Sequence, residues 1–222
     1  MNWSEIFLGA IIGSFLGTLL TAFLDWQRRP NLTITVDDNP NKGLRIVDGR
    51  TFEYKFANVV VKNESRNFLG SLLYGNIPAN NCRAWVIFQD YDTKAELLKI
   101  NARWATNREP VFAGILDLGS ILVVSRESVP VGDSASITVA VKTNQTSDIF
   151  GFNNENYMYY PTFPSPYNSL WGKDTHNIGC EKRYRVFVKI LADGNTYCEG
   201  FLLVNNQTLD SFKLIALGNE EY

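Results

Sequence analysis

Histidine is almost absent from this chain, since His176 is the only one in 222 residues. A histidine-dependent acid–base centre therefore has a single candidate. Three patterns that mark common catalytic sites are also missing: Gly-Lys-Ser/Thr for phosphate binding, Gly-x-Ser-x-Gly for a nucleophilic serine, and His-Glu-x-x-His for zinc. We predict that the protein is not an enzyme and needs no cofactor.

An excess of either charge is missing as well. The chain carries 21 basic and 23 acidic residues, which gives a formal net charge of −2. The charges are scattered along the sequence, and no basic stripe of the kind that nucleic-acid binding requires is present. Nucleic acid is therefore not an expected partner.

Cysteine is rare, and the three residues of this type are Cys82, Cys180 and Cys198. An odd number argues against a full disulfide framework. A hairpin predicted around Asp193-Gly194 places Cys198 opposite Lys189, so Cys180 and Cys198 are not a natural cross-strand pair. Free thiols are the simpler interpretation, and they favour a reducing compartment.

His176 and Cys180 have a spacing that resembles a metal-binding motif, His-x3-Cys. Together with Cys82 and Cys198 they would complete a four-ligand zinc set. Structural zinc sites usually contain two closely spaced ligand pairs, whereas these two cysteines each stand alone in the sequence. Buried thiols and a loop histidine explain the pattern more simply, and no metal site is predicted.

A long apolar run is present near the start of the chain, from Ile6 to Leu24, with no charged residue between Glu5 and Asp25. As a helix these residues would extend roughly 28 Å, close to the ~30 Å hydrocarbon core of a bilayer. A buried helix of a soluble domain usually carries a polar stripe. A cleaved signal peptide usually begins with basic residues, which are missing here. The run therefore predicts one transmembrane helix, with a lipid bilayer as its partner.

Small residues recur every four positions along this helix, at Gly9, Gly13, Gly17 and Thr21. This small-xxx-small spacing lets two helix backbones approach closely in lipid. The four residues are our candidate helix interface. Self-association into a homo-oligomer is the favoured interpretation, and packing against another membrane protein is also compatible with the pattern.

Arg28 and Arg29 follow the apolar run, whereas no lysine or arginine precedes it. The positive-inside rule therefore places the main domain in the cytoplasm of a single-pass membrane protein. Four Asn-x-Ser/Thr triplets occur in the main domain, about the number that an asparagine-rich chain produces by chance, so they carry no weight for an extracellular domain. Their asparagines are Asn31, Asn63, Asn144 and Asn206.

The sequence divides into a membrane segment, residues 1–29, and one domain, residues 30–222. Pro30 ends the helix, and the alternating apolar residues of 32–36 at once indicate a half-buried strand. Further segments rich in Val, Ile, Phe and Tyr are separated by turn residues. They predict an immunoglobulin-like antiparallel β-sandwich, with strands at 42–47, 52–62, 83–89, 97–104, 120–125, 134–142, 181–192, 195–204 and 209–216.

Two long loops interrupt the predicted strands, at 63–80 and 144–179. The second is rich in aromatic residues that could stack on a sugar or grip a peptide. Alternatively, they fold back and cover one end of the sandwich. The candidate ligand-binding residues are Tyr157, Tyr159, Tyr160, Phe163, Tyr167 and Trp171.

Four short motifs run through the first half of the domain: Arg28-Arg-Pro-Asn-Leu32, Val61-Lys-Asn63, Ala79-Asn-Asn-Cys-Arg-Ala-Trp85 and Arg103-Trp104. They resemble uncharacterised small prokaryotic membrane proteins with one N-terminal transmembrane helix and a β-sandwich domain. The resemblance implies a membrane-tethered β domain and no activity, and the long 63–80 segment departs from the pattern.

The tryptophans of these motifs, Trp85 and Trp104, are expected to lie on neighbouring strands and to fill the core. Arg83 and Arg103 would lie on the same strands and pair with acids or stack on aromatic rings.

The favoured hypothesis is a non-enzymatic, membrane-anchored and self-associating protein whose β domain is an interaction or sensing module at the membrane face. The alternative is an extracytoplasmic glycan- or peptide-binding protein that uses the 144–179 loop.

Overall fold

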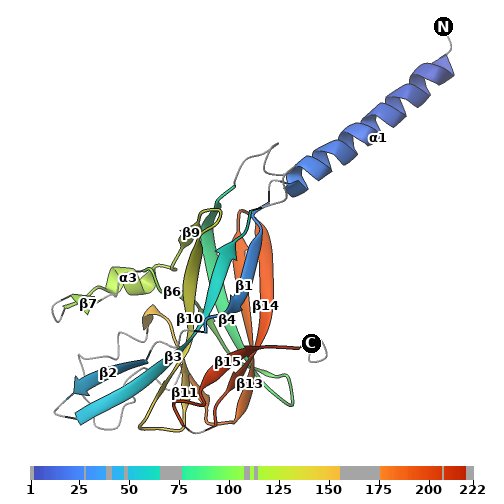
Figure 1. Cartoon of the computed structure of the whole chain (residues 1–222). Coiled ribbons are helices and arrows are strands. Elements are labelled where there is room, and N and C mark those ends of the chain that lie inside the picture. The colour runs from blue at the N-terminus through green and yellow to red at the C-terminus, as the bar shows by residue number, and fades with distance from the viewer. Residues whose placement is uncertain are drawn as a thin grey trace.

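The chain folds into two antiparallel β-sheets in a sandwich-like arrangement, with one helix projecting from an end (Figure 1). This computed structural model describes residues 3–27, 29–38, 42–47, 50–65, 77–107, 111–112, 115–155, 176–206 and 208–218. The mainly β class and the sandwich are thus confirmed. The immunoglobulin-like topology stays a prediction.

The first sheet has seven strands, in the order β1-β3-β10-β11-β12, with β2 paired to β3 and β6 paired to β10. The bounds of its strands are β1 Leu32–Val36, β2 Lys42–Val47, β3 Arg50–Asn63, β6 Arg103–Trp104, β10 Ser134–Thr143, β11 Ile149–Gly151 and β12 Asn177–Gly179. The second sheet has six strands, in the order β15-β14-β13-β4-β5, with β9 paired to β4. Its strands are β4 Ala79–Asp90, β5 Glu96–Asn101, β9 Glu127–Val129, β13 Arg183–Ala192, β14 Asn195–Val204 and β15 Lys213–Ala216.

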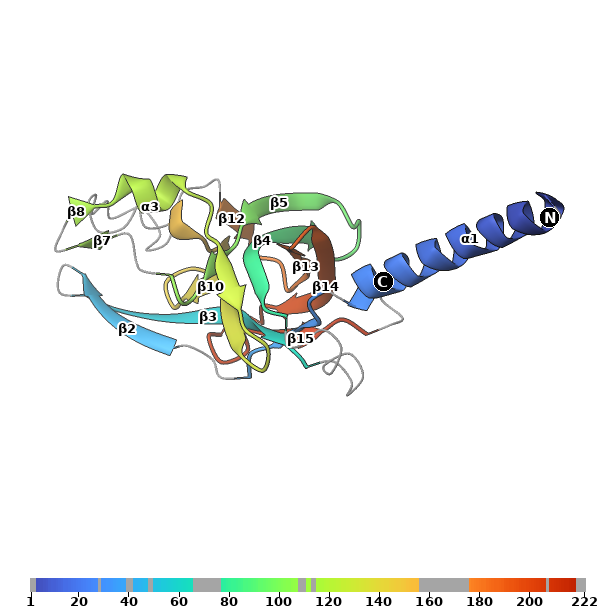
Figure 2. The same ribbon diagram turned by 90° about the horizontal axis from the view of Figure 1, so that it is seen from above.

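The segment between β6 and β9 leaves the sandwich. It contains a small hairpin, β7 Val111–Phe112 with β8 Ile115–Leu116, and the short helix α3, Leu118–Leu122. Figure 2 shows this hairpin and α3 on the side of the sandwich away from the long helix α1, Trp3–Gln27.

The core lies between the two sheets, because alternate residues of the central strands point inward. In β4, for example, Ala84, Val86 and Phe88 are buried, whereas the residues between them are half-exposed. Trp104 is fully buried in the same core. Residues on the outer face of β4 are therefore available for other roles.

Most predicted strands are confirmed, and two of them, 42–47 and 195–204, have the predicted bounds. The predicted strand 97–104 is divided at Ala102, because the chain changes sheets there. The Ala102 amide donates to Ala84 in the second sheet, and the Ala105 amide donates to Ser136 in the first.

The predicted strand at 120–125 is wrong, because part of this segment forms helix α3. The Asp117 carboxylate accepts hydrogen bonds from the amides of Gly119 and Ser120, which caps the helix N-terminus. A cap of this kind outweighs the β propensity of the residues that follow. Residues 66–76 of the predicted 63–80 loop lie outside the described residues.

The predicted hairpin between β13 and β14 is confirmed. Asp193 and Gly194 both have positive φ, 46° and 78°, which is the geometry of a type I′ turn. The register that this turn sets places Cys198 opposite Lys189, as the sequence indicated.

Helix α1 extends away from the sandwich (Figure 1). Its described side chains are exposed or half-exposed along its length. Phe7, Phe15 and Leu20 are 70%, 64% and 58% exposed. Over the part of the chain that the structure describes, no helix combines the length and apolar character that crossing a membrane requires. The transmembrane role of α1 stays a prediction.

The junction between α1 and the sandwich is held by two side chains. The Tyr197 hydroxyl donates to the carbonyl of the buried Pro30, with an oxygen–oxygen distance of 2.6 Å. The Asn63 side chain accepts from the Asn31 amide at 3.2 Å. The first residues of the domain are therefore tied to both sheets.

Candidate functional site

The outer face of the second sheet collects the half-exposed side chains of β4 and β13. Because Ala84 and Val86 of β4 point into the core, Arg83, Trp85 and Ile87 between them point outward. Phe187 and Lys189 of β13 point to the same side by the same alternation. We call this surface the Trp85 face, and its residues are Arg83, Trp85, Ile87, Lys99, Phe187 and Lys189.

The strand register brings cations to three sides of Trp85. Lys189 lies directly opposite Trp85 on β13. Lys99 of β5 lies opposite Ile87, which places it diagonally from Trp85. Arg83 precedes Trp85 by two positions on the same face of β4. Side chains in such positions start about 5–8 Å apart, so one ligand can contact all four.

None of these cations is paired with a described acidic residue. Within the described residues, Arg83, Lys99 and Lys189 form no salt bridge. The chain as a whole has a net charge of −2, so this face is positive on a slightly acidic protein. Unpaired cations on a surface attract anionic groups over roughly a Debye length.

A second cation–aromatic group lies further along the same sheet, where Arg183 and Arg185 approach the Tyr91 ring. Each guanidinium carbon is 5.6 Å from the ring centroid, within cation–π range. The Arg185 Nε also donates to the Tyr91 carbonyl at 3.2 Å. Arg183 is exposed and extends the positive surface, whereas Arg185 is buried beneath it.

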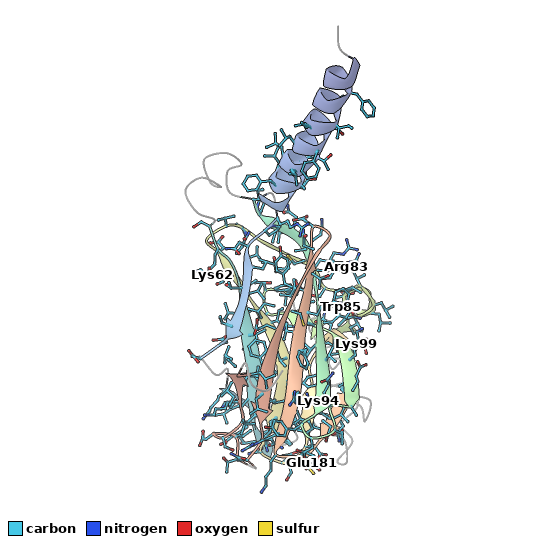
Figure 3. All side chains as sticks on the ribbon, turned by 90° about the vertical axis from the view of Figure 1, so that its right-hand side faces the viewer. Lys62, Arg83, Trp85, Lys94, Lys99 and Glu181 are labelled. Atoms are coloured by element: carbon cyan, nitrogen blue, oxygen red, sulfur yellow. The ribbon has the colours of Figure 1, made fainter. Side chains whose placement is uncertain are left out.

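Figure 3 shows this side of the molecule, with Arg83 and Trp85 nearer to α1 and Lys99 further from it. The surface is built on regular strands, so its side chains are held at fixed spacings. It offers an aromatic and aliphatic centre, Trp85 with Ile87 and Phe187, beside cations. Such a surface can bind a partner that has both apolar groups and carboxylates.

No protein-family model, no curated protein and no solved structure matches this chain. The resemblance to small prokaryotic membrane proteins therefore stays a prediction. The candidate site depends on the geometry alone.

The two tryptophans that the sequence placed together in the core are separated by the structure. Trp104 is fully buried on β6 of the first sheet, whereas Trp85 is half-exposed on β4 of the second. The prediction for Trp85 is wrong, because the alternation of β4 gives its inward positions to Cys82, Ala84 and Val86. Arg103 is buried and donates from Nη2 to the Asn107 carbonyl at 2.9 Å.

The aromatic candidates of the 144–179 loop lie outside the described residues, since 156–175 are not described. This set is Tyr157, Tyr159, Tyr160, Phe163, Tyr167 and Trp171. The candidate interface residues Gly9, Gly13, Gly17 and Thr21 lie on helix α1. An added Cβ at Gly13 or Gly17 would meet nothing within 4 Å, so this side of α1 is open.

The zinc arrangement is not assembled. In the part of the chain that the structure describes, no three His, Cys, Asp or Glu residues are grouped so that they could hold a metal. His176 is buried, and its Nε2 lies 3.4 Å from a Glu155 carboxylate oxygen. All three cysteines are free, as predicted: Cys82 is buried, and Cys180 and Cys198 are exposed.

The cysteines are expected to differ in reactivity. Burial raises the pKa of the Cys82 thiol to about 11, and its Sγ donates to the Ala79 carbonyl. A rise from 9 leaves about a hundredfold less thiolate in mildly alkaline solution. Burial also raises the pKa of the Cys198 thiol. In the folded protein, iodoacetamide should therefore modify the exposed Cys180 fastest, Cys198 more slowly and Cys82 slowest, as read by peptide mass spectrometry. Urea should make the modification rates of the three cysteines similar. Fast labelling of Cys82 in the folded protein would contradict its predicted low reactivity.

The Trp85 face was missed by the sequence reasoning, although a signal for it is present. In Arg83-Ala-Trp-Val-Ile-Phe-Gln89, two alternating sets of residues are both apolar enough to face a core. The small Ala84 and the preceding Cys82 belong to one set, and Arg83 belongs to the other. The charged residue marks the outward set, and Trp85 belongs to it.

Proposed function

We propose that this protein is a membrane-anchored binding module whose Trp85 face binds an acidic polypeptide partner at the membrane surface. The observation that carries the proposal is a group of three cations around a half-exposed tryptophan, which form no salt bridge with any residue that the structure describes. Tryptophan and arginine are the residues that most often dominate protein interfaces. The apolar side chains of Ile87 and Phe187 favour a polypeptide over a purely charged ligand.

Membrane anchoring is supported by the surface of α1. Most of its described large apolar side chains, among them Phe7, Ile11 and Phe15, are more than half exposed. A soluble protein rarely exposes so large an apolar surface, and a bilayer would cover it. The two arginines that follow the helix favour a cytoplasmic β domain.

Self-association is supported by the small-residue side of α1. The hydroxyls of Thr18 and Thr21 donate to the carbonyls four residues earlier, Ser14 and Gly17, both at 2.9 Å. Their polar atoms are therefore satisfied within the helix. What remains is a shallow surface that a second copy of α1 can approach closely. We also propose that the β-sandwich has an immunoglobulin-like topology.

Binding at the Trp85 face can be measured with poly-L-glutamate as the acidic polypeptide and alginate as an acidic polysaccharide. The double variant R83E/K189E should weaken poly-L-glutamate binding by about tenfold or more at low salt, and added salt should weaken wild-type binding. The single variant K189E should also weaken binding, and its matched control is K62E, which makes the same change of charge on β3 of the other sheet. Equal losses for both variants would contradict the proposed site, and binding of alginate alone would favour the glycan alternative.

Self-association can be measured by crosslinking the full chain in liposomes. Gly13→Leu should reduce the crosslinked dimer several-fold, because the larger side chain separates the helix backbones. The control Phe15→Leu changes a bulky position and should leave the dimer unchanged. If the chain does not float with the liposomes in a density gradient, the anchoring proposal itself is contradicted.

A further inference from the structure

A lysine is fully buried at the end of the sandwich interior. Lys142 lies near the end of β10, after a β-bulge that shifts the register between Thr138 and Ala140. The bulge inserts one residue, so Ala140 and Lys142 share the inward side that an unbroken alternation would give to Val141. The lysine is thus turned inward by the backbone.

The Lys142 amine contacts a side-chain amide. Its Nζ donates to Oδ1 of Asn205, which follows β14 and is itself 1% exposed. Within the described residues the amine forms no salt bridge. A buried ammonium without a carboxylate at salt-bridge distance is costly, because it loses its hydration and no direct ion pair replaces it.

The Asn205 amide is fixed in one orientation. Its Nδ2 donates to the carbonyls of Ser147 and Glu181, at 3.0 and 3.2 Å. Its backbone amide donates to the Lys182 carbonyl at 2.8 Å. Because both Nδ2 hydrogens are engaged, the carbonyl side of the amide is held toward the lysine.

The surroundings favour the neutral amine. Burial lowers the pKa of Lys142, and the opposing attraction of Asp148 is the smaller influence. A neutral amine carries the lone pair that a nucleophile needs. Asp148 immediately precedes Ile149, which lies opposite Lys142 in the pairing of β10 with β11, and its Oδ2 accepts from the Asn177 Nδ2 at 3.1 Å.

We propose that Lys142 and Asn205 join through an intramolecular isopeptide bond. The Nζ lone pair attacks Cγ of Asn205, and the new C–N bond forms as the Cγ–Nδ2 bond breaks. Asp148 takes the proton that the amine releases and returns it to the departing nitrogen. The amine and the carboxamide thus become a secondary amide and ammonia, with no oxidant, metal or cofactor required.

The bond would connect the two sheets. Lys142 belongs to the first sheet, and Asn205 follows the last residue of β14 in the second, 63 positions later. It would also remove the titratable amine from the interior. A covalent link of this kind makes the unfolded chain less extended, as a disulfide does.

Intact mass spectrometry of the full chain under denaturing conditions tests the proposal. The wild type should be lighter than its sequence by one ammonia, and digestion should release a branched peptide that joins Lys142 to Asn205. Lys142→Met and Asn205→Ala should each have the mass of their sequence. Asp148→Ala should reduce the linked fraction at least several-fold, because the proton carrier is lost.

Lys55→Met is the matched control, because Lys55 is also buried but donates to the backbone carbonyl of Asp210. That variant should keep the ammonia loss. A wild type with the full mass of its sequence would overturn the proposal. An ammonia loss that persists in Lys142→Met would also overturn it, since the loss would then come from another asparagine or glutamine.

Discussion

Replacing Trp104 with alanine is expected to cost about 3–5 kcal/mol in the free energy of unfolding. The side chain is fully buried, and the two-residue strand β6 pairs with β10 through Ile137. Removing the ring leaves a cavity that the surrounding strands cannot fill. Urea titration followed by circular dichroism would measure the change.

Two further variants make the Trp104 result specific. Trp104→Phe should cost much less, about 1 kcal/mol, because the Trp104 Nε1 is buried without a hydrogen-bond partner and its loss removes that penalty. Trp85→Ala should cost about 1 kcal/mol or less, since Trp85 is half-exposed on the outer face. Equal losses of unfolding free energy from Trp85→Ala and Trp104→Ala would contradict the placement of Trp104 in the core and Trp85 outside it.

Asn63→Ala is expected to cost about 3 kcal/mol or more, although the residue is polar. Asn63 is fully buried, and its Nδ2 donates to the carbonyls of Ile77 and Val129, both at 3.0 Å. Its Oδ1 accepts from the Asn31 amide. Alanine leaves the Val129 carbonyl without this partner in a buried place and the Ile77 carbonyl and Asn31 amide without it in part-buried ones, which is more costly than the loss of the bonds themselves.

Asn58 provides the matched control on the same strand. It is 4% exposed, but its Oδ1 has no hydrogen-bond partner. Asn58→Ala therefore removes an unsatisfied atom and should cost clearly less than Asn63→Ala in the same urea titration. The opposite order would refute the role of Asn63 as the residue that ties Asn31 to the sandwich. The burial of Asn63 also makes its Asn-x-Ser triplet inaccessible in the folded chain.

Local signals in the sequence were enough to predict most strands of the second sheet. The Asp193-Gly194 turn fixes the register of β13 and β14, because both residues adopt the positive φ of a type I′ turn. Sheet membership needs contacts far apart in the chain, so the change of sheets at Ala102 was not predictable from alternation. The inward turn of Lys142 depends on a bulge, which has no clear sequence signal here.

The candidate site was less predictable than the fold. Sequence reasoning chose aromatic residues of a long loop, which lie outside the described residues. The Trp85 face instead combines residues from three strands, β4, β5 and β13, that are separated by up to about a hundred positions in the chain. In the sequence, nothing distinguishes these cations from other solvent-exposed lysines and arginines. Only the register shows that Lys99 and Lys189 lie on the two sides of β4.

The hydrogen bonds at the junction with α1 fix how far the Trp85 face lies from that helix. Tyr197 and Asn63 hold the start of the domain, and Arg83 and Trp85 lie toward the α1 end of β4 (Figure 3). Trp85 is six residues from the first residue of that strand, a rise of roughly 20 Å. With α1 in a bilayer, partners would be selected by the distance of their acidic segment from the membrane surface as well as by charge. An acidic segment carried on a long stalk would pass above the site, and one that emerges close to the lipid would meet it.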